Sequence, residues 1–232
     1  MGWKDVWRIK GAKAPNALQP PDLMALNGYD TGAGCADFEA MATFAETCAR
    51  RLDIGPHTEL LEIGCGGGAW LYHHFIAGTP VNGADISPGH LKVAKYLMPG
   101  GTFVCADATN LPYPDASFDI VFAGACFLCL PDWDHAQKGI SEIARTMRDG
   151  GRGAITDLPD LDRKSEGERV RRGTLGEAEY ERLYAGLKHQ YFDRKQIVDV
   201  AGALGLQATT TTQEIAGYGN SPYRFNLWLE KR

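Results

Sequence analysis

The sequence of 232 residues lacks the long apolar runs that mark exported and membrane-spanning chains. It contains no run of about 18 uncharged apolar residues, the length that a helix needs to cross a bilayer. The N-terminus, MGWKDVWRIKG, has no apolar stretch of the kind that a secretory signal carries. These absences predict a cytoplasmic protein without a membrane partner.

Positive charge is not in excess either. The chain has 24 Lys and Arg residues against 29 Asp and Glu residues, which gives a net charge of −5. Proteins that bind nucleic acid through its phosphates need a surplus of positive charge, so we expect no nucleic-acid partner.

A cysteine pattern is missing as well. Six cysteines without an export signal are typical of reduced thiols. Cys126 and Cys129 alone have the spacing of a redox pair or of half a zinc site. No second cysteine pair or companion histidine at ligand spacing supports a zinc or redox site there. Asp157, Asp160 and Asp162 offer oxygen ligands for Mg²⁺, but their spacing does not favour a magnesium site. We therefore expect no metal.

The length and composition of the sequence are those of one folded domain with additional segments. Hydrophobic residues make up 44% and charged residues 23%, which excludes collagen-like, low-complexity and disordered classes. Residues 1–36 are rich in Pro, Gly and Asn and show no sustained period. They predict an irregular arm with at most a short helical turn that pairs Trp3 with Trp7. Residues 37–232 form the expected main domain, and Asp37 is the expected N-cap of its first helix.

Short apolar runs then alternate with helical stretches. This alternation predicts an α/β fold of the doubly wound, Rossmann-like class, in which helices cover both faces of a mostly parallel sheet. Two late strands, over 207–214 and 223–230, should pair antiparallel at one edge. The other expected strands are 59–63, 81–86, 102–105, 118–123 and 152–156, and the expected helices are 68–77, 88–97, 134–147 and 195–204.

A charged segment over 160–192 interrupts this rhythm. Its second half, from Glu177, is compatible with a helix. We expect the segment to be an insertion that acts as a lid or recognises the substrate.

The most informative stretch is LLEIGCGGGAW at 60–70. Its glycines allow a tight turn at the carboxyl end of the first strand, where open α/β sheets bind their ligands. The spacing Gly64-x-Gly66-x-x-Ala69 also fits a dinucleotide fingerprint, so an NAD(P)-dependent oxidoreductase stays open at this point.

Two acids follow at the ends of the next two strands. Asp85 ends the second strand, where a carboxylate can accept both hydroxyls of a ribose in either cofactor class. Asp107 ends the third strand, where it could bind the exocyclic amine of an adenine. A dinucleotide site has no standard need for this second acid.

The stretch EIGCGGG at 62–68, the two acids and LPYPDASFDIV at 111–121 together resemble the class I S-adenosylmethionine-dependent methyltransferases, small-molecule type with an E-x-G-C-G-x-G motif. The resemblance covers about residues 58–158 and implies a seven-stranded sheet with an antiparallel edge strand. It implies methyl transfer to a hydroxyl or amine of a small polar metabolite, such as a sugar or a secondary-metabolite precursor. The cofactor would be S-adenosylmethionine, with S-adenosylhomocysteine as its product.

The resemblance also carries cofactor roles onto residues at the ends of the first four strands. The glycine loop and Glu62 would hold the methionine part, Asp85 the ribose and Asp107 the adenine amine. Tyr29 belongs to the arm expected to close over the cofactor. The expected cofactor-binding set is Tyr29, Glu62, Gly64, Cys65, Gly66, Gly68, Asp85, Ile86, Asp107, Ala108, Ala123 and Gly124.

Methyl transfer from a sulfonium is a direct displacement, so a base is needed only for a hydroxyl acceptor. The candidate catalytic residues are His135, Asp157 and His189. Each has a structural alternative: a solvent-facing residue in the first turn of a helix, a loop cap, and a helix end packed on the sheet, respectively.

Arg171 and Arg172 belong to a run with five positive charges between residues 163 and 172 against two negative ones. A phosphate or carboxylate on the substrate would explain the surplus, and so would a solvated charged face. With Tyr191 they form the expected substrate-binding set. The expected partner is a small-molecule acceptor, and the expected assembly is a monomer or a homodimer. A catalytically silent scaffold that only binds S-adenosylmethionine stays open as an alternative function.

Overall fold

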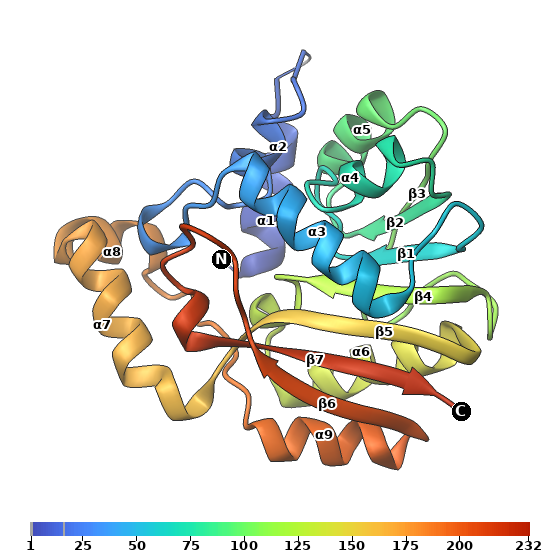
Figure 1. The fold of residues 1–232 in the computed structure, drawn as a ribbon. Coiled ribbons are helices and arrows are strands. Elements are labelled where there is room, and N and C mark those ends of the chain that lie inside the picture. The colour runs from blue at the N-terminus through green and yellow to red at the C-terminus, as the bar shows by residue number, and fades with distance from the viewer. Residues whose placement is uncertain (1, 16) are drawn as a thin grey trace.

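A seven-stranded sheet organises the computed structural model, which describes residues 2–15 and 17–232 (Figure 1). Its strand order is β3-β2-β1-β4-β5-β7-β6. Strands β3 to β5 pair in parallel, and β7 pairs antiparallel with both β5 and β6. The strands are β1 (Leu60–Ile63), β2 (Val81–Asp85), β3 (Thr102–Cys105), β4 (Phe118–Gly124), β5 (Met147–Pro159), β6 (Leu206–Thr212) and β7 (Arg224–Lys231).

The predicted fold class is confirmed, including the antiparallel pairing of the two late strands. The antiparallel strand β7 lies one position in from the edge, because β6 forms the edge itself. Every residue of β1 is buried, as expected of a central parallel strand with helices on both faces.

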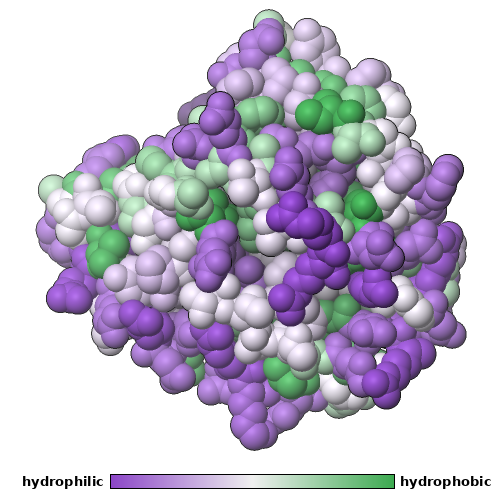
Figure 2. Space-filling view, viewed as in Figure 1, coloured by the Kyte–Doolittle hydropathy of each residue, from purple (hydrophilic) through white to green (hydrophobic). Residues whose placement is uncertain are grey.

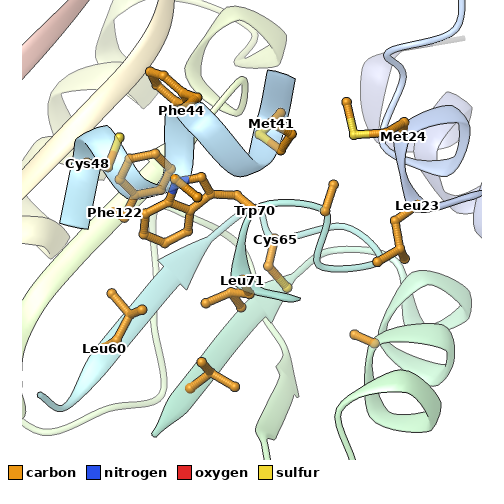
Figure 3. Packing of buried hydrophobic residues seen from close by; sticks show 14 of the residues in the cluster. Leu23, Met24, Met41, Phe44, Cys48, Leu60, Cys65, Trp70, Leu71 and Phe122 are labelled. Carbon is orange, nitrogen blue, oxygen red and sulfur yellow. The ribbon is translucent and has the colours of Figure 1, made fainter. Parts of the chain in front are cut away.

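Three helices cover one face of the sheet: α3 (Phe38–Leu52), α4 (Leu71–Ile76) and α5 (Pro88–Leu97). Asp37 caps α3 as predicted, since its side chain accepts a hydrogen bond from the backbone N–H of Ala40 at 2.7 Å. Figure 3 shows side chains of α3 pointing toward the Trp70 ring. This ring stacks on the Phe122 ring, with centroids 3.7 Å apart and an interplanar angle of 4°. This stack joins the loop before α4 to β4 in one core cluster.

The other face is covered by α6 (Trp133–Thr146) and α9 (Arg194–Ala203). Asp132 and Asp193 cap these helices through side-chain bonds to the backbone of His135 and Gln196. Ile140 and Ile143 of α6 and Ile197 of α9 are fully buried against the sheet. Two separate core clusters therefore hold the strand ends at fixed positions.

The N-terminal arm is more regular than the prediction allowed. It contains two α-helices, α1 (Trp3–Ala12) and α2 (Asp22–Leu26), and a short 3₁₀ turn, η1 (Gly32–Gly34). The expectation of an irregular arm was wrong because α1 is held by distant contacts. Gly11 lets α1 lie directly on α5, since a Cβ there would stand 2.3 Å from the Ser87 hydroxyl. Trp3 and Trp7 do stack, with ring centroids 6.5 Å apart.

The charged segment also contains more helix than predicted. After a turn, η3 (Leu161–Arg163), it forms α7 (Lys164–Leu175) and α8 (Glu177–Tyr184). The helix from Glu177 is confirmed, whereas α7 was not foreseen. Thr174 of α7 accepts a hydrogen bond from the backbone of Ala33 at 3.2 Å, so this segment lies against the N-terminal arm. Two further 3₁₀ turns are η2 (Phe127–Cys129) and η4 (Ser221–Tyr223).

The surface is mainly polar on the face seen in Figure 2, where hydrophobic residues form only small patches. Within residues 2–15 and 17–232, no helix has the length and apolar character needed to span a bilayer.

Candidate active site

Two adjoining cavities lie at the carboxyl ends of the parallel strands, where α/β sheets place their ligands. We call them the glycine-loop cavity, of about 120 Å³, and the lid-side cavity, of about 240 Å³. The first lies against the loop after β1, and the second lies between the N-terminal arm and the 160–192 segment. The residues that line both are Trp3, Trp7, Asn27, Tyr29, Ala125 and Cys129.

The loop after β1 has a backbone that only glycine adopts readily. Gly64 and Gly66 have φ angles of +70° and +56°. A Cβ on Gly64 would stand 2.5 Å from the Cys126 sulfur, and one on Gly66 would stand 2.7 Å from the Asn27 amide. The glycines therefore keep the floor of the cavity open and let other side chains approach the loop.

Asn27 fixes this loop from the N-terminal arm. Its side-chain nitrogen donates to the carbonyl of Cys65 at 3.0 Å, and its oxygen accepts from the N–H of Gly67 at 2.9 Å. Sequence reasoning singled out the neighbouring Tyr29 but missed Asn27, because its partners lie about forty positions away along the chain. The asparagine before a glycine was the only signal in the sequence.

Asp85 fixes the same loop from β2. One carboxylate oxygen accepts from the N–H of Gly66 and the other from the N–H of Ser87, both at 2.8 Å. Burial raises the pKa of Asp85 even though these bonds favour its charged form. Each oxygen keeps a second lone pair, so the carboxylate can shape the loop and still accept a ligand hydroxyl.

Glu62 faces the glycine-loop cavity with one carboxylate oxygen unpaired. The residue is only 3% exposed, and its Oε2 atom has no hydrogen-bond partner in the part of the chain that the structure describes. Burial, together with the charge of Asp85, raises the pKa of Glu62 well above 4.5. A buried carboxylate that lacks a partner and lines a cavity is suited to a ligand that brings a positive charge, such as the amine of S-adenosylmethionine.

Asp107 meets the N-terminal helix at the far rim of this cavity. Lys4 donates to one oxygen at 2.5 Å, and Thr109 donates to the other from its N–H and its hydroxyl. Burial raises the pKa of Asp107, but these hydrogen bonds outweigh burial and the net shift is downward. Arg8 adds a bond to the carbonyl of Ile86 at 3.3 Å, so α1 lies across the rim.

The lid-side cavity is lined by charged and aromatic groups. Asp157 has a left-handed backbone with φ of 61° and is 4% exposed. Its oxygens accept from Gln213 and from the Tyr218 hydroxyl, each at 2.9 Å, and the Nε atom of Arg224 lies 3.7 Å away. Burial raises the pKa of Asp157, and Arg224 opposes that shift.

His189 is held in one tautomer by Arg171. A guanidinium can only donate, so the Nδ1 atom of His189 must accept the hydrogen bond between them and the ring proton must lie on Nε2. Burial and the two nearby arginines, Arg224 and Arg171, lower the pKa of His189 well below 6.5. The ring stacks on Trp3 at 5.1 Å. In this tautomer His189 has an N–H donor on Nε2 and no free lone pair, an arrangement less suited to a base, and its catalytic role stays a prediction.

Three of the candidate catalytic and substrate-binding residues line neither cavity, namely His135, Arg172 and Tyr191. His135 lies in the first turn of α6, where its Nδ1 atom is hydrogen-bonded to Asp132 at 2.6 Å. A place in the first turn of a helix is the structural alternative given above for this residue. Arg172 pairs with Glu177 and Glu181 and so does not reach the cavity. Tyr191 supports Arg171 from behind, as its hydroxyl accepts from Nη2 at 2.7 Å.

The structure brings most of the expected cofactor set together around the glycine-loop cavity. Cys65, Gly68 and Ala123 do not line it and are buried beside it. Among the described residues, no three His, Cys, Asp or Glu side chains are grouped so that they could hold a metal ion. The members that line the cavity are Tyr29, Glu62, Gly64, Gly66, Asp85, Ile86, Asp107, Ala108 and Gly124.

Comparison with known proteins agrees with this geometry. Residues 61–155 match the family described as "Methyltransferase domain". The chain is 37% identical over 129 residues to the methyltransferase GfsG of Streptomyces halstedii, which covers 52% of this chain and 45% of that protein. The chain therefore spans less than half the length of the curated relatives that it matches.

Solved structures share the fold over nearly the whole chain. Magnesium protoporphyrin IX methyltransferase from Synechocystis, solved with bound S-adenosylhomocysteine, gives a TM-score of 0.63 at 17% identity and covers 98% of this chain and 94% of its own. The [4+2]-cyclase SpnF gives 0.65 at 14% identity, with 100% and 97% covered. Residues 61–155 therefore match a methyltransferase domain, and the solved structures share the predicted Rossmann-like fold.

Proposed function

We propose that this chain transfers the methyl group of S-adenosylmethionine to a hydroxyl or amine of a small molecule bound in the lid-side cavity. The observation that supports this is the pair of cavities that share a wall. The glycine-loop cavity has the carboxylates that a cofactor with an amine, a ribose and an adenine requires, and the lid-side cavity opens next to it.

Each acid of the glycine-loop cavity has a separate role in this proposal. Glu62 holds the amine of the methionine part and Asp85 holds the ribose hydroxyls. Asp107 accepts the adenine amine, with Ile86 and Ala108 against the ring. The cofactor supplies an activated methyl group on a sulfonium, so the protein has to align the acceptor and exclude water.

The base for a hydroxyl acceptor is Asp157 in our proposal. Its carboxylate lines the lid-side cavity, and the bonds from Tyr218 and Gln213 fix its orientation. Burial raises its pKa and so makes the carboxylate a better proton acceptor. An amine acceptor that arrives neutral needs no base before the transfer.

The division of the chain follows from the same proposal. Residues 1–36 form a cap over the cofactor site, because Trp3, Lys4 and Trp7 line the glycine-loop cavity. Within the main domain over 37–232, the segment 160–192 covers the acceptor, because Arg171, Leu175 and His189 line the other cavity.

A calorimetric titration tests the cofactor half of the proposal. We expect micromolar binding of S-adenosylhomocysteine and no binding of NAD or NADP to protein stripped of copurified ligand. Asp85→Ala should weaken this binding, whereas Asp149→Ala, at a side chain that is 85% exposed, should not. Binding of NAD or NADP alone would refute the assignment.

Transfer of a labelled methyl group to panels of hydroxylated and amine acceptors tests the other half. Turnover that falls strongly in Asp157→Asn with a hydroxyl acceptor, and hardly at all with an amine acceptor, would support the assigned base. Tight cofactor binding without turnover on any acceptor class would favour the silent scaffold instead. The name of the cyclase SpnF illustrates that this fold also occurs in an enzyme named for other chemistry.

A further inference from the structure

Two buried arginines in the lid-side cavity have unused hydrogen-bonding capacity. Arg224 is 4% exposed, and its Nη1 atom has no hydrogen-bond partner within the described residues. Arg171 is 7% exposed and donates to His189 and Tyr191, both neutral groups. Burying a guanidinium without an acceptor for each donor is unfavourable, so this arrangement indicates a missing acceptor.

Among the described residues that line the cavity, the charged groups leave one cation without a counter-ion. Lys10 pairs with Asp30 at 3.5 Å, and Arg224 lies 3.7 Å from Asp157. Arg171 donates to His189 and to Tyr191, whose hydroxyl donates to Glu168 at 3.3 Å, and no carboxylate of the described residues accepts directly from Arg171. One surplus positive charge matches one negative charge on a ligand, which favours a carboxylate over a doubly charged phosphate.

Much of the remaining cavity wall is apolar or aromatic, although Asn27, Thr31 and Asn220 also line it. The rings of Trp3 and His189 stack with centroids 5.1 Å apart, and the centroid of the Tyr184 ring lies 6.3 Å from that of Trp3. Four leucines complete this wall, namely Leu128, Leu175, Leu183 and Leu187. The aromatic rings and leucines form a surface that suits the apolar body of a ligand.

We propose that the methyl acceptor is a small carboxylic acid with an apolar, preferably aromatic body, whose carboxylate is held by Arg171 and Arg224. This inference rests on the proposed function and narrows its acceptor class. Arg224 comes from the start of β7 and Arg171 from α7, so the two arginines join the sheet to the lid segment. A bound acid would therefore be held between the sheet and the 160–192 segment.

The test uses the full chain saturated with S-adenosylhomocysteine and four carboxylic acids, each paired with its neutral amide: benzoate, phenylacetate, 3-phenylpropionate and hexanoate. Calorimetry should give at least one acid that binds about tenfold or more tightly than its amide. The aromatic acids should bind better than hexanoate. Equal affinity for acid and amide in all four pairs would overturn the proposal.

Variants locate the site. Arg171→Met should abolish the preference for the acid, because it removes the cation whose hydrogen bonds go to the neutral side chains of His189 and Tyr191. Arg172→Met is the matched control, since this neighbouring arginine pairs with Glu177 and Glu181 outside the cavity and should keep the preference. A preference that survives in Arg171→Met would place the acid elsewhere and overturn the proposal.

Binding of S-adenosylhomocysteine is measured on every variant and separates the possible failures. Unchanged cofactor affinity in Arg171→Met shows that the variant is folded. Loss of acid preference with intact cofactor binding then supports the acceptor assignment. Absence of cofactor binding in the unmodified chain would refute the proposed function itself, whereas cofactor binding without any acid preference would refute only this inference.

Discussion

Replacement of Glu62 by glutamine should change stability and cofactor affinity in opposite directions. The Glu62 side chain is 3% exposed, and one of its oxygens has no partner among the described residues. Leaving a buried polar group unsatisfied costs about 1–3 kcal/mol, and more when it is charged. Glutamine keeps the shape and removes the charge, so we expect the unfolding free energy of the cofactor-free protein to rise by about 1–2 kcal/mol at neutral pH.

The same substitution should weaken binding of S-adenosylhomocysteine. A charge-assisted bond between an amine and a carboxylate contributes about 1.5–3 kcal/mol, which corresponds to a loss of roughly ten- to hundred-fold in affinity. Thermal unfolding without cofactor should show a melting temperature higher by about 2–4 °C for each kcal/mol gained. Calorimetry with S-adenosylhomocysteine measures the second effect.

The pH dependence supplies a further check on Glu62. Burial and Asp85 raise its pKa above 4.5 in the folded chain, so the folded state holds the proton to higher pH than the unfolded state does. The contribution of Glu62 to the unfolding free energy of the wild-type protein should therefore fall as the pH rises from about 4.5 through the folded pKa. The Glu62→Gln variant should lose this part of the pH dependence.

Glu142→Gln is the matched control for this prediction. Glu142 accepts from Arg145 and from the N–H of Leu111, and the hydrogen bond from Arg145 lowers its pKa. Its replacement should lower stability and leave cofactor affinity unchanged. A Glu62→Gln protein that is less stable than wild type and binds S-adenosylhomocysteine equally well would refute the reasoning.

Two further substitutions probe the loop and the core. Gly64 has a φ of +70°, and a Cβ there would stand 2.5 Å from the Cys126 sulfur. The Gly64→Ala variant should therefore have an unfolding free energy lower by more than about 1 kcal/mol in denaturant titrations, and it should bind the cofactor weakly. Gly150→Ala has a similar φ of +77° with open space around it; equal losses in the two variants would show that the contact with Cys126 is unimportant. Burial lowers the pKa of His74 to about 4 from 6.5, so protonation of this one ring should contribute a loss of about 2 kcal/mol of stability as the pH falls from about 7 to about 5. His74→Phe, which keeps a ring against Trp70, should reduce that loss, and an unchanged pH profile would contradict the assignment.

Local signals in the sequence predicted the parts of the structure that depend on neighbouring residues. The cap at Asp37, the alternation of strands and helices and the glycine turn at Gly64 each follow from a short segment. Helix α1 was missed because its stability comes from contact with α5. Arg224 was not singled out because an arginine at the start of a late strand looks like an ordinary exposed residue, and only the fold buries it beside Asp157.

The mixed pairing at the end of the sheet also affects how the protein is assembled. The residues of the glycine-loop cavity all precede β5, apart from Thr156 in that strand, so they are synthesised in the first two thirds of the chain. The lid-side cavity needs Tyr218 and Arg224, and the latter is placed only when β7 inserts between β5 and β6. Such pairing over a long sequence separation forms slowly. The growing chain therefore contains every residue that lines the glycine-loop cavity before it contains those that complete the lid-side cavity.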